Sequence, residues 1–302
     1  MSALAQLGLL LALAPLTQGV AQRVKSWMAG RRGPALLQPY RDLLRLFRKG
    51  AVYSTTATWI SQMAPPVIMA ATLGAFLFVP LGAPRAPLAF PGDLVLFAYL
   101  LALARFALIA LAMDAGSSFE GMGASREAWI AAMAEPALFL ALGALAVMSG
   151  EISLSGLLAS GSGASLYGAG LTRALVAVAL WLVLLAETSR MPVDDPATHL
   201  ELTMVHEVMI LDVSGPDLAL CEYANAVKLY GLSLLLSQVV VPPGAGWGAH
   251  LLAQLAGVGA CAALVGVTES LTARVAMRRV PQLLIGASVL AGVALVAALG
   301  AR

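Results

Sequence analysis

Long apolar stretches recur along the whole chain, and short polar segments separate them. Eight of these stretches are close to the ~20 residues that an α-helix needs to cross the hydrocarbon of a bilayer. They predict membrane-spanning helices at about 3–22, 63–82, 94–113, 129–149, 170–187, 218–240, 249–270 and 281–300. The pattern therefore predicts an all-α polytopic membrane protein, folded as a single membrane domain over residues 1–302.

The first polar segment, residues 23–62, is strongly basic. Between Pro34 and Lys49, apolar side chains fall on one face of a predicted helix and arginines on the other. This pattern is typical of an amphipathic helix that lies on the membrane surface, with its basic side chains on lipid headgroups. The basic residues of the segment are Arg23, Lys25, Arg31, Arg32, Arg41, Arg45, Arg48 and Lys49.

The segment 187–217 is long and acidic, in contrast to the apolar helices around it. Met191-Pro192, Asp195-Pro196 and Gly215-Pro216 interrupt it, so it cannot form one continuous helix. It is either a solvated connector with a short surface helix or a surface built for a function. Its charged and histidine residues are Glu187, Arg190, Asp194, Asp195, His199, Glu201, His206, Glu207, Asp212 and Asp217.

Composition supports a membrane protein and sets its orientation. Hydrophobic residues make up 60% of the chain and charged residues only 11%, with a mean hydropathy of +0.87, which excludes an ordinary soluble domain. The loops 23–62, 114–128, 188–217 and 271–280 hold 8, 1, 1 and 3 Lys/Arg, whereas the alternate loops hold only Arg85. The positive-inside rule therefore predicts that the acidic segment faces the cytoplasm and that both termini lie outside.

Several ionisable side chains fall inside or at the ends of predicted spans, where charge is costly. Arg105 and Glu135 lie about 12 and 9 Å from the cytoplasmic ends of consecutive spans, so they can form an ion pair. Most of these charges sit in the cytoplasmic half, which predicts either a water-filled chamber open toward the acidic segment or static pairs that only fix helix packing. The set comprises Arg105, Asp114, Glu135, Glu187, Glu222, Lys228 and Glu269.

No motif indicates a catalytic or metal centre in this chain. His206-Glu207 is followed by Ile210 where a zinc-protease signature needs a second histidine. Cys221 and Cys261 lie in apolar runs without other ligands at suitable spacing, so they read as small buried hydrophobes. Ser125 is well placed to cap the helix that enters the span 129–149. We expect lipid as a partner and no nucleic acid.

Several of these segments resemble the respiratory complex I subunit 1 family. Residues 30–46 (GRRGPALLQPYRDLLRL) are similar to its first cytoplasmic loop, and residues 187–194 (ETSRMPVD) to the segment after its fifth span. The sequence of 192–220 departs from the quinone-reducing branch of that family. It resembles the membrane subunit of formate hydrogenlyase and other energy-converting NiFe hydrogenases, as do residues 123–127 (GASRE), 269–274 (ESLTAR) and Arg279-Val280-Pro281.

The resemblance implies an eight-helix subunit that joins a membrane arm to a peripheral redox arm in a prokaryotic inner membrane. Its partners would be hydrogenase-like small and large subunits and antiporter-like membrane subunits. Iron–sulfur clusters and a NiFe centre would lie in those partners, with no cofactor in this chain. The interface with the peripheral arm would comprise Arg31, Arg32, Arg190, Asp194, Asp195, Glu201, His206 and Glu207. The path that couples electron transfer to proton or sodium movement would comprise Glu135, Glu187, Glu222, Glu269, Asp114, Arg105 and Lys228.

Three interpretations remain open on the sequence alone. The first is the coupling subunit of a hydrogenase-type complex. The second is the quinone-chamber subunit of a complex I-like NADH dehydrogenase, which requires a quinone-sized opening between the first span and the amphipathic helix. The third is an unrelated secondary transporter, which should show inverted repeats and broken midplane helices.

Overall fold

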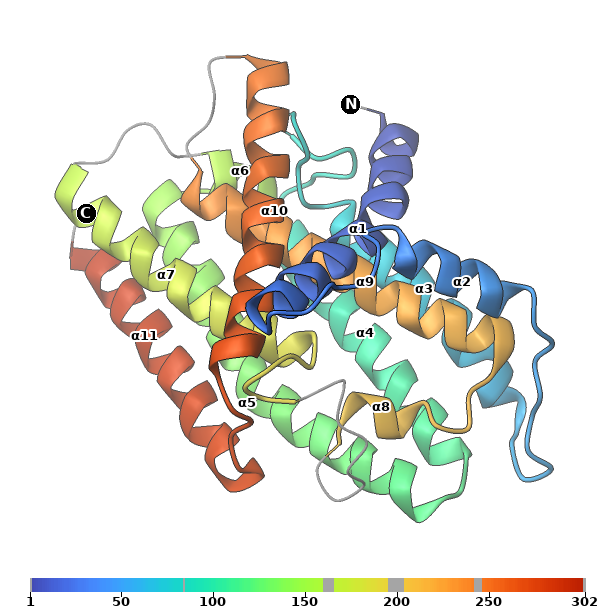
Figure 1. The fold of residues 1–302 in the computed structure, drawn as a ribbon. Helices are drawn as coiled ribbons and strands as arrows, with labels where there is room; N and C mark the ends of the chain where they lie inside the picture. The colour runs from blue at the N-terminus through green and yellow to red at the C-terminus, as the bar shows by residue number, and fades with distance from the viewer. Residues whose placement is uncertain (1, 84, 160–165, 195–203, 242–245, 301–302) are drawn as a thin grey trace.

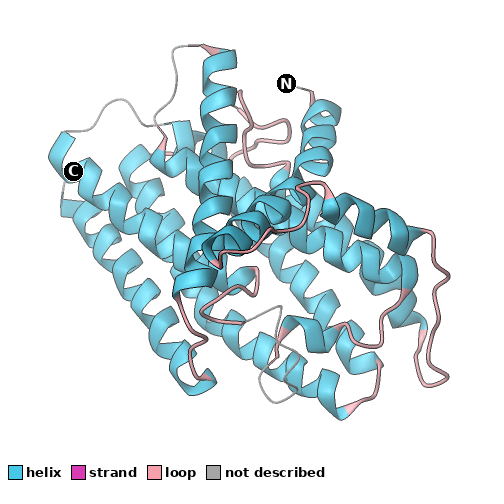
Figure 2. Cartoon of the chain, in the orientation of Figure 1, coloured by secondary structure: helices cyan, strands magenta, loops and turns pink. Residues whose placement is uncertain are grey.

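The computed structural model describes residues 2–83, 85–159, 166–194, 204–241 and 246–300, and in those ranges the chain is helical without any strand (Figures 1 and 2). The helices are α1 (Ala3–Met28), α2 (Gln38–Phe47), α3 (Trp59–Phe76), α4 (Asp93–Asp114), α5 (Ser118–Ser149), α6 (Leu154–Ala159), α7 (Leu166–Glu187), α8 (His206–Met209), α9 (Gly215–Val240), α10 (Trp247–Leu271) and α11 (Val280–Gly300), with a 3₁₀ turn, η1, at Met277–Arg279. The prediction of an all-α membrane protein is confirmed at this level.

Each of the eight predicted spans coincides with a long helix: α1, α3, α4, α5, α7, α9, α10 or α11. Six helical segments among the described residues are long and apolar enough to cross a bilayer: Ala3–Met28, Asp93–Asp114, Ser118–Ser149, Gly170–Glu187, Trp247–Leu271 and Met277–Gly300. α3 and α9 are not among these six. The count of eight spans therefore stays a prediction.

The start of α5 differs from the sequence-based expectation. The segment 114–128 was expected to be a loop, but α5 begins at Ser118 and continues for 32 residues. Ser117 caps it by accepting a hydrogen bond from the backbone N–H of Phe119 (3.3 Å), and Glu120 lies in the first turn, where the helix dipole favours an acidic residue. The prediction that Ser125 caps this helix is wrong, because Ser125 lies inside it.

The long helix α9 lies at the centre of the packing, in contact with α1, α2, α3, α7 and α10. α11 lies along α5 and α7, while α1 packs against α9 and α10, and α3 lies between α4 and α9 (Figure 1). α9 approaches α3 closely at Gly231, where an added Cβ would lie 2.2 Å from the ring of Phe76. Phe76 in turn makes an edge-to-face contact with Phe97 of α4, with ring centroids 5.8 Å apart.

α3 ends six residues before the predicted end of its span, and the chain continues as a buried non-helical segment. Such backbone is tolerated at membrane depth only where protein satisfies its hydrogen bonds. Gln6 of α1 donates to the carbonyls of Phe76 (3.1 Å) and Val79 (2.7 Å). Gln238 of α9 donates to the carbonyl of Pro80, and Gln254 of α10 accepts from the N–H of Gly82 (2.7 Å). Three buried glutamines from three helices thus replace the missing last turns of α3.

The predicted amphipathic helix forms at α2 and is tied to α1. The hydroxyl of Tyr40 donates to the backbone carbonyl of Ala12, and Arg23 donates to the carbonyl of Pro34 (3.0 Å) just before α2. Leu44 and Phe47 remain 57% and 42% exposed. An uncovered apolar face beside arginines is what a helix in the bilayer interface requires.

Candidate functional site

A buried cluster of charges surrounds Arg105 of α4, which is only 7% exposed. Its guanidinium pairs with Glu135 of α5 (Nη1 to Oε1, 2.5 Å), with Glu127 of α5 (Nε to Oε1, 3.6 Å) and with Glu187 at the end of α7. The predicted pair of Arg105 with Glu135 is therefore present. Burial of a charge without such partners would cost several kcal/mol, so these contacts are what keeps an arginine inside the bundle.

Glu187 links this cluster to Lys228 of α9, whose Nζ lies 2.8 Å from its Oε2. One carboxylate thus serves two cations from different helices. A small cavity of about 30 Å³ lies beside the cluster and is lined by Arg105, Glu127, Glu187 and Lys228 among others. Nε of Arg105 and Oε2 of Glu127 have no hydrogen-bond partner in the described part of the chain, and the cavity is large enough for a water molecule.

A second cluster forms around Glu269 of α10. Its carboxylate lies 3.2 Å from Nζ of Lys25 in α1 and 3.1 Å from Nη1 of Arg190, which follows α7. α1 and α10 approach closely here because Gly266 has no side chain: an added Cβ would lie 2.5 Å from the carbonyl oxygen of Ala21. Glu269, like Glu187, is shared by two cations.

A polar cavity of about 380 Å³ opens beside this second cluster. It is lined by Gln18, Gln22, Lys25, Ser26, Pro34, Thr188, Ser189, Arg190, His206, Glu207, Glu222, Asn225 and Glu269. Ser189, His206 and Asn225 also line the small cavity beside Arg105, so these three residues lie between the two cavities and their charge clusters. The structure contains features of both predicted alternatives: the charges form ion pairs, and the paired residues also line a cavity.

Two carboxylates of the polar cavity, Glu207 and Glu222, make no ion pair within the described ranges. Burial and the nearby carboxylate of Asp194 raise the pKa of Glu207 above its usual value. Burial, with the nearby charges of Lys228 and Arg190, lowers the pKa of His206 to about 4, so this imidazole is neutral at pH 7. These groups can take up or release a proton without breaking a salt bridge.

The acidic segment is folded into the protein where the structure describes it. Asp194 is 2% exposed; it pairs with Arg274 (2.8 Å) and accepts from the backbone N–H groups of Val205 (3.1 Å) and His206 (3.2 Å). Arg190 is also buried. The interpretation as a merely solvated connector is therefore wrong for these residues. Asp195, His199 and Glu201 lie outside the described residues.

Asp114 lies apart from both clusters. Its carboxylate accepts from the N–H and hydroxyl groups of Thr58 (2.9 and 2.5 Å) and of Ser61 (3.1 and 2.5 Å), which fixes the start of α3. The structure thus gives this residue a capping role, and its place on the coupling path stays a prediction.

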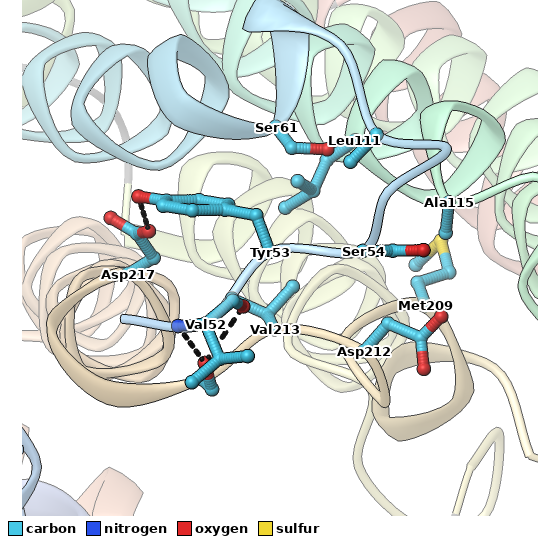
Figure 3. Close-up of a pocket in the computed structure, with 12 residues that line it drawn as sticks. Val52, Tyr53, Ser54, Ser61, Leu111, Ala115, Met209, Asp212, Val213 and Asp217 are labelled. Carbon is cyan, nitrogen blue, oxygen red and sulfur yellow. Dashed lines mark hydrogen bonds between the residues drawn. The ribbon is translucent and has the colours of Figure 1, made fainter. Parts of the chain in front are cut away.

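The segment before α3 is tied to the start of α9 (Figure 3). The hydroxyl of Tyr53 donates to Asp217 (2.6 Å), and Ser214 accepts from the N–H of Val52 (2.9 Å) and donates to its carbonyl (3.1 Å). Hydrogen bonding to Asp217 raises the pKa of Tyr53. These hydrogen bonds therefore fix the basic segment to the start of α9, the helix that carries Glu222 and Lys228.

The remaining predicted interface residues, Arg31 and Arg32, are exposed just after α1. Sequence reasoning missed Glu127 and Lys25 as members of the clusters. Glu127 lies eight residues before Glu135, about two helical turns, so a helix beginning at Ser118 would have revealed it. The sequence did not distinguish Lys25 as a buried partner, because it is one of eight basic residues in its segment.

Among the described residues, no group of three or more His, Cys, Asp or Glu side chains could hold a metal ion. Cys221 and Cys261 are both free cysteines.

Comparison with known proteins gives consistent matches over the whole chain. The family model described as NADH dehydrogenase matches residues 1–300. Hydrogenase-4 component C of Escherichia coli (strain K12) is 33% identical over 242 residues, covering 80% of this chain and 75% of that protein. Formate hydrogenlyase subunit 4 of the same organism is 35% identical over 146 residues, 48% of each chain. NADH-ubiquinone oxidoreductase chain 1 of Triticum aestivum is 29% identical over 237 residues, covering 74% of this chain and 71% of that protein.

A solved structure of a membrane-bound sulfane sulfur reductase, an archaeal respiratory membrane complex, contains a chain with the same fold. The TM-score is 0.86 at 22% sequence identity, and the match covers 98% of both chains. At this identity the likeness concerns the fold alone.

Proposed function

This chain belongs to the NADH dehydrogenase family, that of complex I subunit 1, and we propose that it is the membrane subunit of a hydrogenase-type complex. Its relatives named hydrogenase-4 component C and formate hydrogenlyase subunit 4 support this assignment. The third interpretation, an unrelated secondary transporter, is wrong because the family match extends over residues 1–300.

The proposed role is to couple electron transfer in a peripheral arm to the movement of protons or sodium ions. The observation that carries it is that the Arg105 and Glu269 clusters border two neighbouring cavities, which share Ser189, His206 and Asn225 in their linings. Glu187 and Glu269 are each shared by two cations, so a change of charge at one partner redistributes the pairing at the other. We propose that this sharing gives the clusters the two arrangements that coupling between sites requires.

Glu222 and Glu207 are the proposed proton-exchanging groups, because they line the polar cavity without an ion-pair partner in the described ranges. Glu135, whose side chain is 42% exposed, would connect the Arg105 cluster to the bundle surface. Redox cofactors, iron–sulfur clusters and a NiFe centre, would belong to hydrogenase-like partner subunits. Antiporter-like membrane subunits would receive the coupled ion.

The proposed location is the inner membrane of a prokaryote, with the basic segments and α8 on the cytoplasmic side and the termini outside. The 13:1 distribution of Lys/Arg between the two sets of loops supports this orientation. Exposed Arg31 and Arg32 would then meet the peripheral arm directly. Buried Arg190 and Asp194 would act on it only through α8 and the segment around Arg274.

The quinone-chamber role is a second candidate, because the polar cavity lies where that role requires an opening. It is bounded by Gln18, Gln22 and Lys25 of α1 and by Pro34 just before α2. Its volume of about 380 Å³ falls in the usual range for ligand pockets, ~300–1,000 Å³. Pro34 is the one apolar residue in its lining, however, and an apolar quinone tail would strip water from the charged groups there. This lining favours water and ions over a quinone.

The deciding experiment is gentle purification of the complex through a tag on this subunit, with identification of the other chains and assays of hydrogen evolution and quinone reduction. Hydrogen evolution with a NiFe large subunit is the expected result. Quinone reduction without hydrogen activity would overturn the proposal in favour of the quinone-chamber role.

A further inference from the structure

A second hollow of about 330 Å³ lies beside the start of α4 and the end of α5, and it shares no lining residue with the cavities at the two charge clusters. It is formed between the segment that precedes α4 and the segment that follows α5. Its lining includes Arg85, Phe90, Pro91, Glu151, Ile152 and Ser153. The proposed coupling role makes no use of it.

The two walls of this hollow are tied together by buried hydrogen bonds. Asp93, which is fully buried at the start of α4, accepts from the N–H groups of Leu154 (2.6 Å) and Phe90 (3.3 Å). Ser155 accepts from the N–H of Ala86 (3.0 Å). Because these hydrogen bonds fix both walls, the pocket is preorganised, and this lowers the entropy cost of binding a ligand.

The hollow presents one positive and one negative side chain. Arg85 and Glu151 are both exposed, and neither side chain has an ion pair or hydrogen bond in the described portion of the chain. Arg85 is also the single Lys or Arg in the loops 83–93, 150–169 and 241–248. Such a pair matches a ligand that itself carries an anion and a cation.

The surroundings of the hollow are those of a membrane interface. Arg85 lies eight residues before the start of α4 and Glu151 two residues after the end of α5, so both follow the ends of predicted spans, where headgroups are expected. Leu88, Phe90 and Ile152 leave 45%, 43% and 65% of their surface exposed at or beside the hollow. Aromatic and aliphatic side chains at this depth contact the upper part of acyl chains.

We propose that this hollow binds the headgroup of a zwitterionic phospholipid with a primary ammonium group, in the leaflet opposite the basic loops. Arg85 binds the phosphate, for which a guanidinium is well suited, and Glu151 binds the ammonium group. The glycerol and upper acyl chains lie over Phe90 and Ile152. The rim on α4 and α5 thereby gains a fixed lipid at the edge of the bundle.

The test uses the whole complex, purified from cells in which a photo-cross-linking amino acid replaces Ile152, a residue exposed at the rim. The adducts are identified by mass spectrometry after exposure to vesicles of phosphatidylethanolamine, phosphatidylglycerol or phosphatidylcholine. Phosphatidylethanolamine should give the most adduct. R85Q should lower the yield of every phospholipid adduct about fivefold, as expected from loss of roughly 1 kcal/mol of charge pairing near a surface.

E151Q should remove the preference for phosphatidylethanolamine over phosphatidylglycerol while leaving total adduct nearly unchanged. R278Q, a loss of an exposed arginine on the other face, is the matched control and should change nothing. Equal yields in wild type and R85Q, or cross-links from position 152 to another polypeptide instead of lipid, would overturn the proposal. The readout is lipid, so it does not depend on the proposed coupling function.

Discussion

Replacement of Arg105 by glutamine tests whether the buried charge cluster holds the bundle together. The change removes the cation that faces Glu127, Glu135 and Glu187. Truncation of one partner of a buried ion pair costs about 3–5 kcal/mol, because the other charge remains buried and unpaired. The full cost does not apply to all three carboxylates. Glu187 keeps Lys228 at 2.8 Å, and Glu135 has a side chain 42% exposed to solvent, which screens its charge.

Glu127 therefore dominates the loss, since Arg105 is the one cation within ion-pair distance of it among the described residues. We expect R105Q to destabilise the subunit by about 3 kcal/mol, the lower end of the range. The double variant R105Q/E127Q should recover part of that loss, because it removes the stranded carboxylate together with its partner.

The assay heats the purified complex in mild detergent and follows the soluble fraction of this subunit by its tag. At about 2 °C per kcal/mol for a chain of this size, R105Q should lower the midpoint by roughly 6 °C. R278Q, at an exposed position, should leave the midpoint within the error. A midpoint for R105Q equal to that of R278Q, or a double variant less stable than R105Q, would refute the reasoning.

Three further predictions concern packing, coupling and pH. Gly231→Ala should destabilise the subunit by about 1–3 kcal/mol, because the added Cβ would lie 2.2 Å from Phe76. Gly143→Ala is the control: its Cβ would have nothing within 4 Å, so it should be neutral or mildly stabilising in the same heating assay. Glu222→Gln should leave the complex assembled but lower ion translocation in proteoliposomes. The control is Asp212→Asn, a change at an exposed carboxylate, which should translocate ions much faster than Glu222→Gln. Equal translocation by the two variants would show that Glu222 is not on the path. The folded-state pKa of His206, about 4, lies below its ordinary value of 6.5. The stability that neutral His206 contributes is therefore present above pH 6.5 and is lost as the pH falls toward 4. His206→Asn should reduce the fall in thermal midpoint between pH 6.5 and pH 4, and an unchanged pH profile would contradict this.

The positions of the long helices could be predicted from the sequence, because each must be apolar over a bilayer's thickness whatever it packs against. The Arg105–Glu135 pair could be predicted as well, since depth in consecutive antiparallel spans depends only on residue counts. Glu127 was missed because its segment is polar enough to resemble a loop, whereas the cap at Ser117 and the packing of α5 against α8 support a helix there.

The Glu269 cluster could not be predicted from spacing. Lys25 and Glu269 lie at opposite ends of the chain and meet because Gly266 lets α10 approach α1, a property of tertiary packing. The early end of α3 could not be predicted either, because it also depends on tertiary packing. The glutamines that replace its last turns come from α1, α9 and α10, and each reads in isolation as a stray polar residue within an apolar run.

This last feature has a consequence for biosynthesis. When α3 enters the bilayer, Gln6 has already been made, but Gln238 and Gln254 have not. The carbonyl of Pro80 and the N–H of Gly82 therefore lack their partners until α9 and α10 are inserted. A chain that stops before α10 leaves the N–H of Gly82 without its acceptor Gln254, and an unsatisfied backbone group inside a bilayer costs several kcal/mol. The buried segment after α3 thus makes the first half of the subunit depend on completion of the second.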